Sequence, residues 1–161
     1  MIIHISWTGP IEIDHIKNYN DRDIDYGLYQ IYGSHPIYGT DVLLYIGKAE
    51  QQTFSERIKR EDWDKNNDKI YIGRLIGNEN MIIMNEWNKK IEIAEKLLIY
   101  SHSPAMNAAN IGSMPENFLN DIIIYNWGVH RQIFPVVSGD RWSKKFDNIP
   151  IEEYYSMKKA K

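Results

Sequence analysis

The stretch "GLYQIYGSHPIYGTDVLLYIG", residues 27–47, predicts the first structural unit of the chain. Residues 27–32 and 41–47 are rich in aromatic and β-branched side chains, which are typical of strands. Between them, residues 33–40 contain the glycines and the proline of a turn. We therefore expect two antiparallel strands joined by a hairpin loop that is somewhat longer than usual.

Two tyrosines of this hairpin raise a functional question. Side chains alternate between the faces of a strand, so Tyr29 and Tyr45 can lie on the same side of the paired strands with converging hydroxyls. Tyrosine is also an ordinary strand residue, and the chain contains 11 of them. From this pair alone, both a site and simple packing stay open.

The residues that follow predict an alternation of helix and strand. Thr53 and Glu56 form a capping box, which predicts a helix over 53–61. Residues 69–76 have the composition of a strand, and apolar residues at helical spacing predict a long helix over 85–101. The other expected elements are a strand over 1–7 that stops before Gly9-Pro10, a strand pair over 121–127 and 132–139, and a helical or frayed segment over 152–161.

This order predicts an α+β fold in one domain, residues 1–161, with no repeat and no low-complexity linker. We expect a small antiparallel or mixed sheet with a three-stranded core, flanked by helices, and extra strands from both ends of the chain.

Composition excludes several classes of protein. The chain has no cysteine, which rules out disulfides and cysteine-ligated metals, and its five histidines lack zinc-type spacing. We see neither a signal peptide nor an apolar run that could span a bilayer, so we expect a cytoplasmic protein without membrane contact.

Net charge is −3, which gives no global reason to bind nucleic acid. Basic residues nevertheless cluster locally, since Lys59 and Arg60 follow Arg57 closely. Further along, Arg131 lies near Trp127 and could help to hold a DNA strand, although a packed hairpin explains this stretch as well. A basic strip for nucleic acid and scattered solvated charges both remain open.

Glu95 lies beside the apolar stripe of the expected helix 85–101, between Ile91 and Ile99. A carboxylate at this border loses hydration and requires a cation, hydrogen-bond donors or partial exposure. A hard ion such as Mg²⁺ would suit it, and so would a neighbouring lysine. Arg57 and Lys48 could supply the matching cations for a phosphodiester.

Taken together, these residues resemble the GIY-YIG nuclease family. The matching elements, which cover residues 27–107, are "GLY" at 27–29, "YIG" at 45–47, Arg57, Glu95 and Asn107 in "AEKLLIYSHSPAMN". The core would then be residues 27–107, with extensions at 1–26 and 108–161. The second tripeptide, Tyr71-Ile72-Gly73, lacks the upstream and downstream partners and falls where the family has its third strand.

The resemblance implies a metal-dependent DNA endonuclease that hydrolyses phosphodiester bonds with Mg²⁺ or Mn²⁺. It implies catalytic roles for five residues: Tyr29, Tyr45, Lys48, Arg57 and Glu95. Glu95 would hold the metal, Tyr45 would be the first candidate for a general base, and Gly47 and Asn107 would brace the site. Lys59, Arg60 and Arg131 are further candidates for binding DNA.

Position 61 departs from the family, which commonly has histidine or tyrosine there. Glu61 could act as a base, bind a second cation or pair with Arg57 across one helical turn. An inactive GIY-YIG-like module that binds nucleic acid or protein is the alternative to an enzyme. Cutting both strands of DNA would call for a homo-oligomer or a partner protein.

Overall fold

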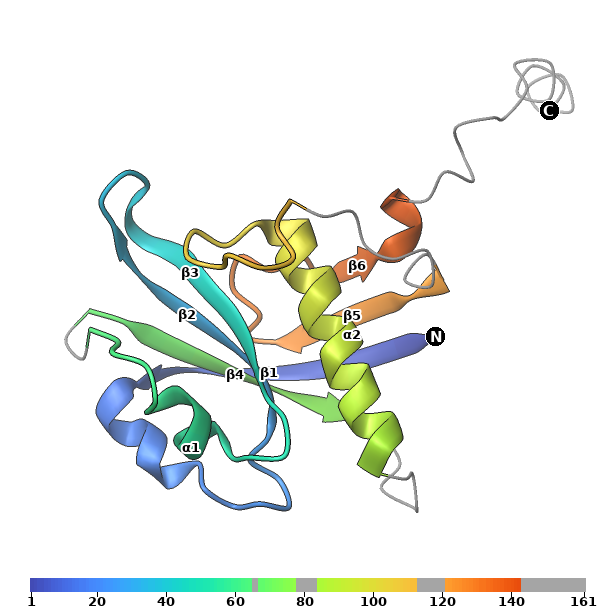
Figure 1. Cartoon of the computed structure of the whole chain (residues 1–161), viewed down its shortest axis with the longest axis horizontal. Coiled ribbons are helices and arrows are strands. Elements are labelled where there is room, and N and C mark those ends of the chain that lie inside the picture. Colours follow the sequence, from blue (N-terminus) through green and yellow to red (C-terminus); the bar gives the residue numbers. More distant parts are fainter. Residues whose placement is uncertain (65–66, 78–83, 113–120, 143–161) are drawn as a thin grey trace, which may run out of the picture.

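A computed structural model describes residues 1–64, 67–77, 84–112 and 121–142. Its elements, labelled in Figure 1 except for the 3₁₀-helices η1 and η3, are β1 (Ile2–Glu12), η1 (Ile13–Asn18), β2 (Gly27–His35), β3 (Gly39–Ala49), α1 (Phe54–Ile58), β4 (Lys69–Ile76), α2 (Met84–His102), β5 (Ile123–Gly128), β6 (Val136–Ser138) and η3 (Gly139–Trp142). The expectation for 152–161 and part of the C-terminal extension lie outside the described residues.

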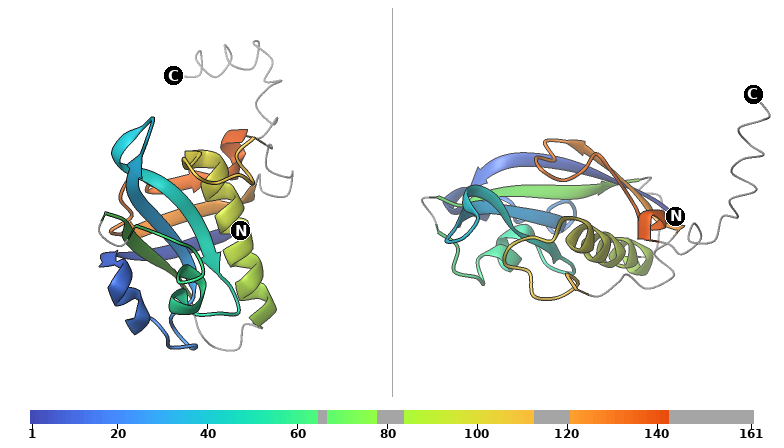
Figure 2. Two further views of the ribbon diagram at one scale, coloured as in Figure 1. Left: turned by 60° about the vertical axis from the view of Figure 1, so that its left-hand side comes forward. Right: turned by 90° about the horizontal axis from the view of Figure 1, so that it is seen from above.

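One sheet contains all six strands, in the order β3-β2-β4-β1-β5-β6. Every neighbouring pair is antiparallel except β1 and β5, which are parallel. Seen from above, the sheet is a curled layer, and α2 runs along one side of it (Figure 2). The α+β fold with a mixed sheet is confirmed. The three-stranded size of the core is wrong, because the terminal strands extend the same hydrogen-bonded ladder instead of standing apart from it.

The first strand is longer than its sequence predicts. β1 continues through Gly9-Pro10 as far as Glu12, and its pairing with β4 shifts register between Thr8 and Ile11. Proline has no N–H to donate, so a strand tolerates it at a bulge where the ladder is interrupted. The bulge therefore carries the strand past residues that normally end one.

Two apolar clusters form the core, and alternation along β2 assigns its residues to them. Leu28 and Tyr32 pack with α2 and β5 in the first cluster. Tyr29 and Ile31 pack with α1 and η1 in the second cluster. Because neighbouring residues of a strand point to opposite faces, β2 separates the two clusters. β3 is the outermost strand on this side, so elements from both faces can meet around it.

No helix of the described residues is both long and apolar enough to cross a membrane.

Candidate functional site

The two tyrosines of the hairpin lie on one face of the sheet, as expected. Tyr29 pairs with Gly47 and Ile31 pairs with Tyr45 across β2 and β3. Residues two apart on a strand share a face, so Tyr29 and Tyr45 are neighbours on a diagonal. Their ring centroids are 6.0 Å apart with an interplanar angle of 30°.

Gly47 makes this arrangement possible. A Cβ atom at Gly47 would lie 2.5 Å from Cζ and Oη of Tyr29 and 2.6 Å from Cε1 of Tyr45. Atoms at such distances overlap, so any side chain here would displace at least one ring. The packing of both tyrosine rings therefore requires glycine at position 47.

Tyr29 is fully buried, and its hydroxyl makes no well-formed hydrogen bond among the described residues, although the hydroxyl of Tyr45 is near enough to interact with it weakly. The Arg57 guanidinium carbon lies 6.0 Å from the centre of the Tyr29 ring. Burial raises the pKa of Tyr29; Arg57 works against this rise, whereas Tyr45 and nearby carboxylates add to it. A buried hydroxyl without a well-formed hydrogen bond costs free energy, so this atom calls for an explanation beyond packing.

Helix α1 positions Arg57. The expected capping box is present, since the Glu56 N–H donates to Thr53 Oγ1 and the Thr53 N–H donates to Glu56 Oε2. This box fixes the start of a helix that would be too short to persist alone. Buried Phe54 and Ile58 anchor it to the second apolar cluster.

Glu61 pairs with Arg57 at the end of this segment. Arg57 Nη1 and Glu61 Oε1 are 2.6 Å apart, four residues apart in sequence. Of the interpretations that the sequence leaves open for Glu61, pairing across one turn is therefore the one that the geometry displays. The contact also places a carboxylate close to both tyrosines. Burial is the main reason that the pKa values of Tyr29 and Tyr45 are raised, and the negative charge of Glu61 raises both further.

Tyr45 is half-buried between two rings. Its ring centroid is 6.0 Å from that of Tyr29 and 5.6 Å from that of Trp63. Burial raises the pKa of Tyr45; Glu61 raises it further, and Arg57 lowers it in part. The phenol is accordingly neutral at neutral pH in the free protein.

Glu95 projects from α2 toward the end of β3. Glu95 Oε2 is 3.8 Å from Lys48 Nζ, and the same ammonium lies 2.8 Å from Glu50 Oε2. The Glu95 side chain is 17% exposed, and burial raises its pKa although Lys48 and Arg57 lower it. Its negative charge is therefore only partly compensated by its neighbours.

The segment after α2 covers the free edge of β3. The N–H groups of Ala105 and Met106 donate to the carbonyls of Leu43 and Leu44. Asn107 continues the pattern with its side chain, which hydrogen bonds both backbone groups of Ile46 over 2.9 Å. Asn107 thus supports the strand that carries Tyr45 and Gly47.

The donor set near Glu95 fits a magnesium or manganese ion held by one carboxylate. Such ions accept one or two carboxylates and take water and phosphate oxygens for the rest. Glu95 supplies a carboxylate whose charge is only partly compensated, and Glu50 is a second carboxylate that contacts Lys48. No set of three or more histidine, aspartate or glutamate side chains among the described residues forms a complete protein cage.

The basic residues after α1 lie close to some of the residues that surround Tyr45. Lys59 lines a cavity of about 610 Å³ together with Glu61 and Trp63, beside η1. Arg60 is exposed in the turn that follows the helix. Lys59 is thus beside two residues that contact the candidate site, Glu61 and Trp63.

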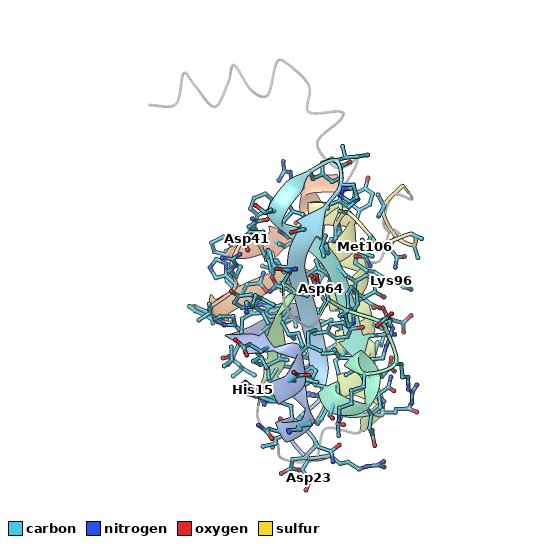
Figure 3. All side chains as sticks on the ribbon, turned by 90° about the vertical axis from the view of Figure 1, so that its left-hand side faces the viewer. His15, Asp23, Asp41, Asp64, Lys96 and Met106 are labelled. Carbon is cyan, nitrogen blue, oxygen red and sulfur yellow. The ribbon has the colours of Figure 1, made fainter. Side chains whose placement is uncertain are left out.

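Arg131 lies elsewhere. Its guanidinium is 2.5 Å from Asp41 Oδ1, and its carbon lies 4.6 Å from the ring centre of Tyr32. In Figure 3, Asp41 lies on the opposite side of the β2–β3 hairpin from Met106, which belongs to the segment that covers the edge of β3. Arg131 therefore connects the loop after β5 to the hairpin, and the tyrosine cluster does not include it.

The second tripeptide belongs to another environment. Tyr71 lies in β4 and pairs with Gln30 of β2. Paired residues share a face, and Gln30 is adjacent to Tyr29 in sequence, so Tyr71 and Tyr29 point to opposite faces of the sheet. Tyr71 is buried in the first apolar cluster, and its ring meets that of Tyr32 edge to face with centroids 5.4 Å apart. The prediction that residues 69–76 form a strand is confirmed.

Sequence analysis did not identify two residues that contact the candidate site, Glu50 and Trp63. Glu50 follows Lys48 by two positions, and this spacing places both on one side of an extended chain, so a local signal existed. Trp63 had no such signal, because its contact with Tyr45 depends on how the segment after α1 returns to the sheet.

Protein-family models, curated proteins and solved structures yield no match to this chain. The resemblance to GIY-YIG nucleases stays a hypothesis that rests on the order of the residues within 27–107 and on the cluster described above.

Proposed function

We propose that the chain is a metal-dependent endonuclease that hydrolyses phosphodiester bonds in DNA by a GIY-YIG-type mechanism. The observation that carries the proposal is the fully buried hydroxyl of Tyr29, which lacks a well-formed hydrogen bond within the described part of the chain and belongs to a residue in contact with Arg57 and Tyr45. An unsatisfied buried polar group requires an explanation, and a catalytic role or an ordered water that completes its hydrogen bonds is one.

In this proposal, the scissile phosphate binds between Lys48 and Arg57. Arginine forms paired hydrogen bonds with phosphate oxygens, and lysine adds a point charge. Both side chains are partly buried, with 28% and 23% exposure, so water screens their charges less than it would at the surface. Their positions on β3 and α1 are rigid, which favours orientation of the reacting bond.

Glu95 would hold Mg²⁺ or Mn²⁺ with water and phosphate oxygens as the remaining ligands. When bound, such an ion stabilises negative charge on the phosphate and on the leaving oxygen. The residues of the chain supply the rest: Glu95 provides the carboxylate, and Arg57 keeps the phosphate in place.

Tyr45 is the candidate general base, and Tyr29 orients the water or the phosphate. A phenol acts as a base only when its pKa falls toward neutral pH. In the free protein, burial and Glu61 raise the pKa of Tyr45 instead. The base role therefore requires additional positive charge near the phenol; without it, Tyr45 serves the reaction as a hydroxyl that orients the attacking water.

The same observations also favour an alternative, a catalytically inactive module that binds nucleic acid or protein. Both tyrosines have raised pKa values, and the two cations already have carboxylate partners. A module of this kind would retain the cluster for stability or recognition without cutting DNA.

The two proposals are separated by incubating supercoiled plasmid with the protein and Mg²⁺ or Mn²⁺. We expect nicked or linear DNA from the wild type and a loss of at least about 100-fold in rate from Glu95→Gln. Glu92→Gln is the matched control, because Glu92 lies one turn earlier on α2 and pairs with Lys96. Absence of cleavage by the folded wild type with either metal would favour the binding module; full activity of Glu95→Gln would exclude the metal assignment.

A further inference from the structure

Arg57 already has a carboxylate partner in the free protein. Glu61 Oε1 lies 2.6 Å from Arg57 Nη1, so a carboxylate occupies one of the donors that the guanidinium could offer to a phosphate oxygen. The guanidinium also lies over the ring of Tyr29, whose hydroxyl is buried. A phosphate that binds through Nη1 must therefore displace Glu61.

The net charge of the site also opposes the binding of a phosphate. Two cations pair with three carboxylates at the site, among the residues that the structure describes. Lys48 contacts Glu50 and Glu95, and Arg57 contacts Glu61. The group carries a formal negative charge, which repels a phosphodiester at short range. Glu61 contributes one of these charges, and it contacts the arginine proposed to bind phosphate.

We propose that Glu61 gates Arg57: it holds the guanidinium in the free protein and competes with the DNA phosphate for it. This inference rests on the proposed function, because it concerns the same phosphate site. It gives Glu61 a positioning role and assigns it neither a proton transfer nor a metal ion. Position 61 would then set how tightly the site binds DNA.

The chain offers a close control for the gate. Glu56 and Glu61 belong to the same short segment, and each side chain is 34% exposed. Glu56 pairs with Arg22 at 2.9 Å, away from Arg57. Glutamine at position 56 can retain the capping box, so Glu56→Gln changes the net charge by the same amount and spares the helix.

The test measures binding of the full chain to a short DNA duplex by fluorescence anisotropy. EDTA prevents cleavage, so one duplex serves every variant, and thermal unfolding verifies that each variant is folded. We expect Glu61→Gln to bind about fivefold more tightly than Glu56→Gln, a difference of about 1 kcal/mol in the free energy of binding. With Arg57→Ala in the background, this difference should disappear.

The outcomes separate the two proposals. If Arg57→Ala weakens binding but Glu61→Gln and Glu56→Gln bind equally, the gate is wrong and the phosphate site stands. If the difference persists without Arg57, Glu61 acts on DNA by general repulsion, and the gate is also wrong. If Arg57→Ala binds as well as the wild type, the phosphate site fails, and the gate fails with it.

Discussion

The side-chain amide of Asn107 takes the place of a neighbouring strand for Ile46. The Ile46 N–H donates to Asn107 Oδ1, Asn107 Nδ2 donates to the Ile46 carbonyl, and both distances are 2.9 Å. β3 is an edge strand, whose outer backbone groups need partners. The asparagine therefore completes the hydrogen bonds of the residue that lies between Tyr45 and Gly47.

Replacement of Asn107 should destabilise the whole chain. Asn107→Ala leaves two buried backbone groups without partners, and we expect a loss of about 2 kcal/mol or more in the free energy of unfolding, measured with urea. Asn18→Ala, at an exposed asparagine of η1, should change stability by less than about 0.5 kcal/mol. Equal stabilities for the two variants would mean that water replaces the amide at no cost.

The two Tyr-Ile-Gly tripeptides provide a matched pair for catalysis. Tyr45→Phe removes a hydroxyl from the proposed site, and we expect plasmid cleavage to slow by at least about 100-fold. Tyr71→Phe removes a hydroxyl on the opposite face of the sheet and should cut at nearly the wild-type rate. Small and equal effects would show that neither phenol takes part in the reaction, which supports the binding module.

Gly47 should not tolerate a side chain. Gly47→Ala places a methyl group against both tyrosine rings, and overpacking of this kind costs about 1–3 kcal/mol. Gly112→Ala is the control, since nothing lies within 4 Å of the added Cβ there. Thermal unfolding would measure both; a Gly47→Ala variant as stable as Gly112→Ala would mean that the rings move aside without strain.

Stability should fall in mild acid because of His102. The Phe134 N–H donates to Nε2 of His102, so Nδ1 carries the proton and faces the Leu98 carbonyl. Only the neutral ring satisfies both contacts, and burial lowers the pKa of His102 from its ordinary value of 6.5. The unfolded chain therefore binds this proton more readily, so the contribution is complete above about pH 6.5 and is lost as the pH falls below it.

Urea unfolding at several pH values between 5 and 8 measures this loss. His102→Gln should flatten the dependence of the free energy of unfolding on pH in this range, whereas His15→Gln, at an exposed position, should retain it. A wild-type dependence that survives in His102→Gln would assign the acid sensitivity to other groups.

Local chemistry was sufficient for several elements. Residues 69–76 form β4 as predicted, and the capping box of Thr53 and Glu56 starts α1. These signals involve residues within a few positions of one another, where propensity and capping act directly. The alternation of faces likewise predicts that Tyr29 and Tyr45 share one side of the sheet, and the pairing of β2 with β3 confirms it.

Sequence by itself thus determined that residues 27–47 form a hairpin, where α1 begins, the long helix and the shared face of two tyrosines, because each depends on short-range periodicity. The long loop expected over 33–40 is wrong, because β2 and β3 keep pairing as far as His35 and Gly39 and leave only residues 36–38 between them. The helix expected over 53–61 is also too long, since α1 ends at Ile58. Tertiary structure alone decided that six strands join one sheet, that Glu95 of α2 meets Lys48 of β3, and that Trp63 packs on Tyr45. Strand β1 pairs in parallel with β5, and the indole of Trp7 donates to Asn126, 119 residues further along the chain. Such contacts form because the packed core makes them favourable together, and no local pattern encodes which distant partner is chosen.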